Sequence, residues 1–263
     1  MSQTDESHPL NLCSPLDSVR HTKNRRRSVV RTALASTALT GSGGRSAEGS
    51  PAATTYIGGM HLLLVRHGRT AANVDFLLDT AHPGSPLDAQ GLAQAQALVT
   101  RLAGEPIEAI FTSDHTRARQ TAAPLAASRG LSAVLHPGLR EVQAGDLEMG
   151  VDWVPYVEVL AAWHHDATVR MPGSESGVEF LARYDAAISD LAATGAERAV
   201  VVSHGAAIRV WAAARCANLT REFLTRAHVP NTGVIRVIGS VHDGWQVESW
   251  DDLPLPPVAK THL

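Results

Sequence analysis

Two histidine–glycine pairs in this 263-residue chain each follow a short apolar run. The first run, 62–65, ends in Arg66-His67-Gly68, and the second, 200–202, ends in Ser203-His204-Gly205. Such runs are typical of buried strands, and open α/β sheets bind ligands at the carboxyl ends of their strands. Arginine binds phosphate through its guanidinium fork, and histidine can act as a nucleophile or acid/base near pH 7. Together with Arg117, which lies between them in the sequence, the two histidine–glycine pairs predict one pocket for a phosphoryl group.

Four segments resemble, in order, the motifs of the histidine phosphatase superfamily, also called phosphoglycerate-mutase-like. They are Leu64–Thr70 with Asn73, Ser113–Thr121, Leu139–Glu141 with Gly145, and Ser203–Gly205. The resemblance extends from Met60 to about Trp250. It implies a three-layer α/β/α fold with a mostly parallel sheet, and the phosphatase branch of the family.

The resemblance also implies catalytic roles. His67 would attack phosphorus and become phosphohistidine, whereas the residues alone leave it as nucleophile or base. Imidazole attacks only when neutral, and the cations of Arg66 and Arg117 should lower the pKa of His67. Glu141 would protonate the leaving alcohol and later deprotonate the attacking water. The expected catalytic set is His67, Glu141, Arg66 and His204.

A second set is expected to bind the phosphate. Gly68 would let the backbone approach it closely. For each of the others a purely structural role stays open, such as helix capping by Thr70 or Asn73, or a hydrogen-bonded core position for His204. Two rival acids, Glu148 and Asp146, lie close to Glu141 in sequence. The expected substrate-binding set is Arg66, Gly68, Thr70, Asn73, Arg117 and His204.

Strands and helices that alternate along the chain must position these residues. Apolar runs predict strands at 61–65, 107–111, 131–135 and 199–202. Helical spacing of apolar residues predicts helices at 88–102, from Ser113 or Asp114 to 130, and at 152–165, 178–193 and 206–217. A hairpin of 234–238 and 245–250, turning at Asp243-Gly244, closes the chain. This order predicts a mostly parallel sheet with an antiparallel strand at one edge.

Residues 1–59 are rich in small and polar side chains and predict a disordered tail. Their weakly apolar segment after Arg25-Arg26-Arg27 makes a poor export signal. We expect translation to begin near Met60, which an intact mass of the native protein would test. The histidine phosphatase domain is expected at 60–253, followed by an irregular tail at 254–263.

Composition limits the partners. A net charge of −3 and 19% charged residues predict no nucleic-acid surface, and no apolar stretch approaches a membrane span. Two cysteines, Cys13 and Cys216, fit a reducing, cytoplasmic location without disulfides. The chemistry needs no cofactor and no metal, since the His164-His165-Asp166 cluster lacks ligand spacing. The expected partner is a small-molecule phosphate ester, and the resemblance makes a homodimer plausible.

Departures from the family's mutases favour water as the final acceptor of the phosphoryl group. Alanines follow Gly205 where those mutases carry asparagine, and Arg170 is the only cation between Glu141 and Pro172. The sequence therefore predicts a phosphatase. A phosphoglycerate mutase activity and a non-catalytic protein that binds phosphorylated ligands remain the alternatives.

Overall fold

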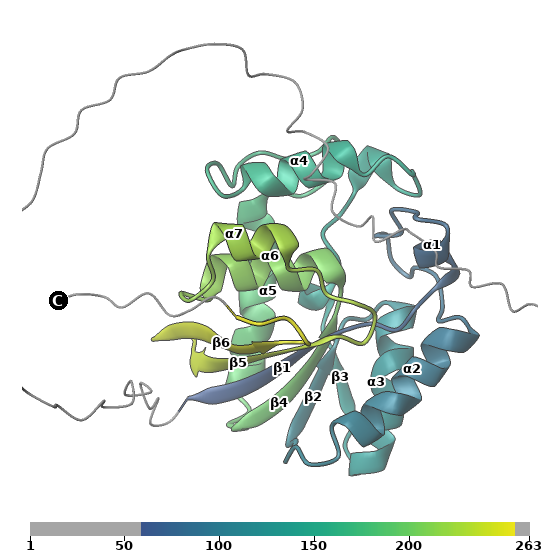
Figure 1. Cartoon of the computed structure of the whole chain (residues 1–263), viewed down its shortest axis with the longest axis vertical. Helices are drawn as coiled ribbons and strands as arrows, with labels where there is room; N and C mark the ends of the chain where they lie inside the picture. The colour runs from purple at the N-terminus through teal and green to yellow at the C-terminus, as the bar shows by residue number, and fades with distance from the viewer. Residues whose placement is uncertain (1–58, 256–263) are drawn as a thin grey trace, which may run out of the picture.

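The computed structural model describes residues 59–255 as a six-stranded sheet between helical layers (Figure 1). The strands lie in the order β3-β2-β4-β1-β5-β6. Their bounds are β1 (Met60–Arg66), β2 (Ala109–Thr112), β3 (Ala133–Leu135), β4 (Arg198–Ser203), β5 (Val234–Ser240) and β6 (Gly244–Trp250). The first four run parallel, whereas β5 pairs antiparallel with β1 and with the edge strand β6. The expected sheet is confirmed.

Helices cover both faces of the sheet (Figure 1). They are α1 (Ala71–Val74), α2 (Ala89–Arg101), α3 (Thr116–Arg129), α4 (Val154–Ala162), α5 (Gly177–Ala192), α6 (Gly205–Arg215) and α7 (Arg221–Arg226), with two 3-10 turns, η2 (Pro137–Leu139) and η3 (Gly145–Leu147). Strand residues alternate between the faces, so Leu63 packs with α2 and α3 whereas Leu62 packs with α5 and α6. The core under α2 and α3 is built from buried aliphatic side chains, and the core under α5 and α6 contains buried aromatic side chains as well.

The register of the central strands places the two histidine–glycine pairs together. β1 and β4 are parallel neighbours, and Arg66 lies opposite Ser203. The residues that follow, His67 and His204, therefore leave the same edge of the sheet side by side. The His67 backbone N–H donates to the Ser203 carbonyl at 3.0 Å, which extends the pairing by one residue.

Several expected boundaries were wrong. Helix α3 begins at Thr116 and is capped by His115 without a side-chain hydrogen bond, not by Ser113 or Asp114. Helix α4 is shorter than 152–165 because Pro155 lies in its first turn and the chain turns after Ala162. The two shortest helices, α1 and α7, were not predicted, because six residues or fewer carry too little periodicity.

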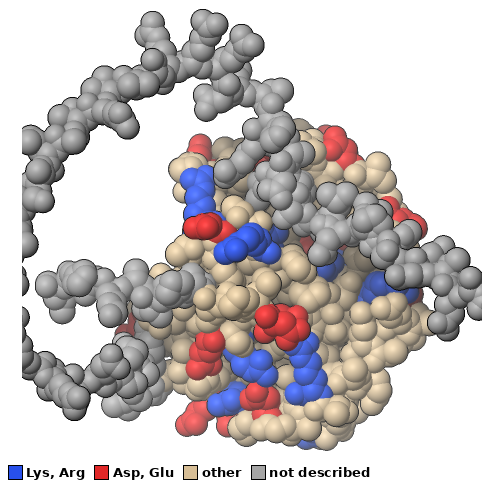
Figure 2. Space-filling model, in the orientation of Figure 1, with Lys and Arg blue, Asp and Glu red and all other residues tan. Residues whose placement is uncertain are grey.

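The segments expected to be tails, 1–59 and 254–263, lie outside the described residues except for 59, 254 and 255. Within the described range, no helix has both the length and the apolar character needed to cross a bilayer. Acidic and basic side chains alternate over the described face in Figure 2, so that face carries no continuous basic surface.

Candidate active site

His67 and His204 form the centre of the site at the carboxyl ends of β1 and β4. Their ring centroids are 5.2 Å apart, and the two residues are 3% and 0% exposed. The His67 Nδ1 lies 2.7 Å from the Gly68 carbonyl oxygen. Because a carbonyl oxygen can only accept, Nδ1 carries the proton. A neutral His67 therefore has its lone pair on Nε2, the atom that a nucleophilic imidazole would use.

The pKa of His67 is held well below its usual value. Burial is the largest cause, followed by the cations of Arg117 and Arg66, whereas the hydrogen bond to Gly68 opposes them. The sequence predicted the effect of the two arginines but not the larger effect of burial. Burial and Arg117 also lower the pKa of His204. Both rings are therefore neutral at pH 7.

Arg117 reaches the site from the first turn of α3. The guanidinium is almost fully buried, and its Nη2 donates to the backbone carbonyl of Asp79 at 2.8 Å. Its Nη1 lies 3.5 Å from the Asp79 carboxylate. Thr121 links α3 to the segment after β1: its Oγ1 accepts from the Gly68 N–H and donates to the Arg117 carbonyl within the helix. By contrast Arg119, two residues further on, is exposed.

Arg66 is held from the opposite side. Its Nη1 donates to the Val229 carbonyl at 2.8 Å. A Cβ at Gly205 would approach the Arg66 Nε to 3.2 Å, so the glycine after His204 makes room for this guanidinium. At Gly68 a Cβ would meet the Gly91 carbonyl oxygen at 2.7 Å, while the expected close approach of the Gly68 backbone to a phosphate stays a prediction. Close packing against α2 is thus reason enough for that glycine.

Glu141 lies beside the same site, at the N-terminus of α6. Its carboxylate accepts the backbone N–H groups of Ala207 at 2.7 Å and Ala206 at 3.2 Å. Arg183 fixes the backbone by donating to the Glu141 carbonyl at 2.8 Å. Since α6 begins directly after His204, these contacts place the carboxylate next to the histidine pair.

The rival acid Glu148 is differently engaged. Its carboxylate accepts hydrogen bonds from the backbone N–H groups of Thr80 and Ala81 and from the Thr80 hydroxyl. These three bonds hold the 79–84 loop that covers Arg117. The geometry favours a structural role for Glu148 and leaves Glu141 as the stronger candidate acid.

Thr70 and Asn73 form a capping box on α1, each accepting a hydrogen bond from the other's backbone N–H. The Asn73 Oδ1 also accepts from the Asn231 side chain at 3.1 Å. The capping alternative is therefore realised, and contact of either side chain with substrate stays a prediction. Among residues 59–255 no group of three or more His, Cys, Asp or Glu side chains is arranged as a metal site.

His115 was missed by the sequence reasoning. Its ring packs edge-on against His204, with centroids 4.8 Å apart, and lies 5.7 Å from the ring of His82. Neither of its ring nitrogens has a hydrogen-bond partner in the described chain. Burial, then Arg117, lowers the pKa of His115 to about 3. The only signal in the sequence is its position two residues before Arg117, the arginine expected to bind phosphate.

His115→Leu is expected to preserve or raise stability at neutral pH and to weaken its pH dependence. A buried, unpaired imidazole loses little when an apolar group of similar size replaces it. In the unfolded chain His115 titrates near 6.5, so the unfolded state binds the extra proton between about pH 3 and 6.5 and stability falls as pH falls. Urea unfolding at several pH values from 5 to 7 gives the free energy of unfolding. Plotted against pH, this free energy should rise less steeply in the variant than in the wild-type protein, by up to about 1.4 kcal/mol per pH unit. An unchanged slope would contradict the buried neutral ring.

The family model for the histidine phosphatase superfamily, branch 1, matches residues 62–253. A PE-PGRS family protein of Mycobacterium tuberculosis is 35% identical over 217 residues, which cover 74% of this chain and 37% of that protein. An adenosylcobalamin/alpha-ribazole phosphatase of Escherichia coli is 32% identical over 152 residues, 55% of this chain and 73% of that protein.

Among solved structures, a mycobacterial glucosyl-3-phosphoglycerate phosphatase in complex with VO3 superposes with a TM-score of 0.62 at 26% identity. The match covers 73% of this chain and 98% of that one. The chain thus spans little more than a third of its mycobacterial PE-PGRS relative but most of the two phosphatases. Sequence motifs, sheet order and matches agree: the chain belongs to the histidine phosphatase superfamily, branch 1.

Proposed function

We propose that this protein is a phosphatase that hydrolyses a phosphate monoester through a phosphohistidine at His67. One observation carries the proposal: a neutral imidazole, with its Nε2 lone pair free of the Gly68 contact, lies beside His204 and two guanidinium groups. The phosphatase names of relatives that this chain covers over most of their length support the same activity.

The reaction would proceed in two displacements. His67 Nε2 attacks phosphorus, the P–O bond to the alcohol breaks, and Glu141 supplies the proton that the leaving oxygen takes up. Water then attacks the phosphohistidine, Glu141 receives a proton from it, and the N–P bond breaks to release phosphate. Arg66, Arg117 and His204 would bind the nonbridging oxygens, whose charge grows in each transition state.

Phosphate release from a panel of natural phosphate esters tests the activity. Continuous release into water, with kcat/KM well above that of the uncatalysed reaction, is the expected result. Phosphoryl transfer between the 2- and 3-positions of phosphoglycerate without release would instead establish the mutase alternative. Tight ester binding without turnover would establish a binding protein.

Asp79→Asn is expected to tighten binding of inorganic phosphate about threefold to tenfold. The Asp79 carboxylate lies next to the Arg117 guanidinium, where it would compete with an incoming phosphoryl oxygen. Removing its charge removes that competitor and leaves the Asp79 carbonyl contact in place, and a gain of about 1 kcal/mol corresponds to this range. Product-inhibition constants measure the effect. Asp190→Asn, a surface position on α5, is the control, and weaker phosphate binding in Asp79→Asn would contradict the competition.

A further inference from the structure

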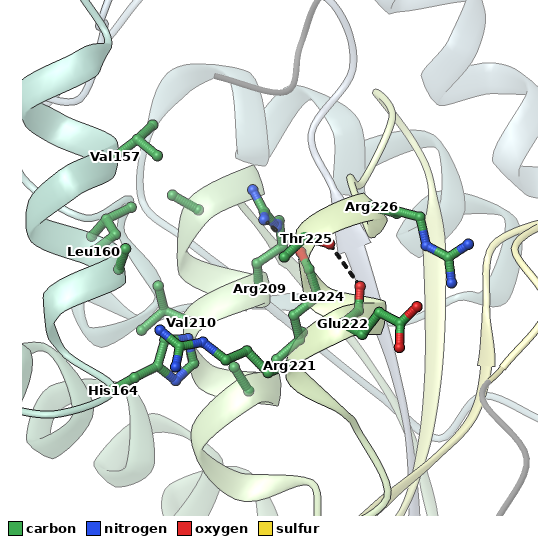
Figure 3. A pocket seen from close by; sticks show the side chains of 13 residues that line it. Val157, Leu160, His164, Arg209, Val210, Arg221, Glu222, Leu224, Thr225 and Arg226 are labelled. Atoms are coloured by element: carbon green, nitrogen blue, oxygen red, sulfur yellow. Dashed lines mark hydrogen bonds between the residues drawn. The ribbon is translucent and has the colours of Figure 1, made fainter. Parts of the chain in front are cut away.

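A cleft of about 910 Å³ lies beside the proposed catalytic centre, between α4, α6 and α7 (Figure 3). One face of α4 lines it with Val157, Leu160 and Ala161, His164 lines it from the turn after that helix, and one face of α6 lines it with Ala206, Arg209, Val210 and Ala213. The α6 set follows the i, i+3, i+4, i+7 spacing of a single helix face, and the α4 set follows its i, i+3, i+4 part. The small side chains at 161, 206 and 213 leave space between these two faces unfilled.

The cleft adjoins Glu141. Ala206 lines it, and the Ala206 backbone N–H donates to the Glu141 carboxylate at 3.2 Å. One turn further along α6 lies Arg209. Burial lowers the pKa of Arg209, and the nearby Glu141 carboxylate is the main opposing influence. An alcohol leaving with a proton from Glu141 would therefore depart at the mouth of this cleft.

The cations of the cleft lack carboxylate partners. Within residues 59–255, no acidic side chain lies within 4 Å of the guanidinium groups of Arg209, Arg221 or Arg226. The Arg209 Nε is buried without a hydrogen-bond partner in that range, and its Nη2 donates only to the Leu224 carbonyl at 3.1 Å. By contrast Arg215, on the same helix but outside the cleft, pairs with Asp185.

The side chains are not oriented alike. Figure 3 shows Arg221 extending toward His164, just after α4, whereas Glu222 and Arg226 of α7 point away from it. The single acidic side chain of the lining is therefore turned away from the α4–α6 gap, Arg221 extends toward that gap, and Arg209 lines the cleft from α6. Valine and leucine side chains supply the apolar walls between them.

We propose that this cleft binds the leaving group of the substrate, and that Arg209 and Arg221 select a phosphate ester whose alcohol carries a second anionic group. The inference rests on the proposed phosphatase activity and names the substrate class for it. An apolar body would lie between α4 and α6, with its anionic oxygens at the two guanidinium groups. Paired guanidinium–oxyanion contacts of this kind are the strong class of hydrogen bond.

Two phosphate esters that differ only in charge test the proposal on the full chain: 4-carboxyphenyl phosphate and its neutral amide analogue, 4-carbamoylphenyl phosphate. We expect the wild-type protein to prefer the carboxylate in kcat/KM by about tenfold, the effect of one retained charge-assisted contact. Arg221→Gln and Arg209→Gln should each reduce that ratio to below about threefold. Arg221 is exposed, so its replacement tests the contact without disturbing the core.

Arg170→Gln is the matched control, because this exposed arginine lies outside the cleft in a surface pair with Glu179. Its ratio should equal that of the wild-type protein. A wild-type kcat/KM ratio near one, or a ratio that Arg221→Gln leaves unchanged, would overturn the assignment of the cleft. Hydrolysis of both esters would in either case leave the phosphatase proposal intact.

Calorimetric titration with the free alcohol, 4-hydroxybenzoate, separates the two proposals. If neither ester is hydrolysed but 4-hydroxybenzoate binds the wild-type protein about tenfold more tightly than Arg221→Gln, the anion site stands and the phosphatase proposal fails. Equal affinities would overturn the anion site. Arg221-dependent binding without any preference between the esters would show a site for a separate anion, and so overturn the leaving-group assignment.

Discussion

His67→Ala is expected to abolish both turnover and the covalent phosphoenzyme. A mutation at a residue that only hydrogen-bonds to the substrate reduces the stabilisation of the transition state. The loss of His67 Nε2 instead removes the atom to which phosphorus would be bonded. Rapid quench of the wild-type protein with a ³²P-labelled ester should trap a phosphoprotein that survives alkali and is lost in acid. The alanine variant should trap none, and its kcat should fall by a factor of at least about 10⁴.

The matched control is His61→Ala, which removes a partly exposed histidine that pairs with Glu248 at the amino end of β1, the end opposite the site. Its trapped phosphoprotein and its turnover should equal those of the wild-type protein. Labelled phosphoprotein in His67→Ala would assign the covalent bond to another residue. Full turnover in that variant would mean that water attacks the ester directly.

The placement of the two histidines follows from the sequence for a physical reason. Parallel neighbouring strands end at the same edge, so two apolar runs that close on His-Gly bring His67 and His204 together once β1 and β4 pair. Arg117 could be predicted because the helix that carries it must start at that edge. His115 could not, because its contacts with His204 and His82 depend on the path of the 78–87 loop.

The cleft beside α4 illustrates the limit of such reasoning. Helical spacing could predict that α4 and α6 each have an apolar face, and the usual inference is that such faces are covered. Whether two faces close or leave a cleft depends on their separation and on the side chains between them, and here residues of α7 and the small residues at 161, 206 and 213 line the space that remains. A helix as short as α7 leaves no periodic signal. From the sequence alone, Arg209 would be taken for an arginine on the exposed face of a helix. In the fold it lies at a cleft.

Glu141→Gln is expected to lower kcat/KM for alkyl phosphates far more than for 4-nitrophenyl phosphate. An alkoxide is a poor leaving group and must be protonated as it departs, whereas nitrophenolate leaves without a proton. General acid catalysis contributes about 10²- to 10⁴-fold, so kcat/KM for glycerol phosphate should fall within that range. With 4-nitrophenyl phosphate the first step should survive and the second should slow, because water then lacks its base. A burst of one nitrophenol per active site should precede a slow steady state.

The variant at the neighbouring acid, Glu148→Gln, separates chemistry from structure. Glutamine at 148 weakens the contacts that hold Thr80 and Ala81, and with them the loop over Arg117. Loosening this loop should change the binding of both esters by the same factor and should produce no burst. At 141 the glutamine carbonyl oxygen can still accept from Ala207, so α6 should keep its capping contact while the proton is lost. If Glu141→Gln lowers kcat/KM for both esters equally and gives no burst, Glu141 only positions α6, and the proton for the leaving alcohol must come from another group.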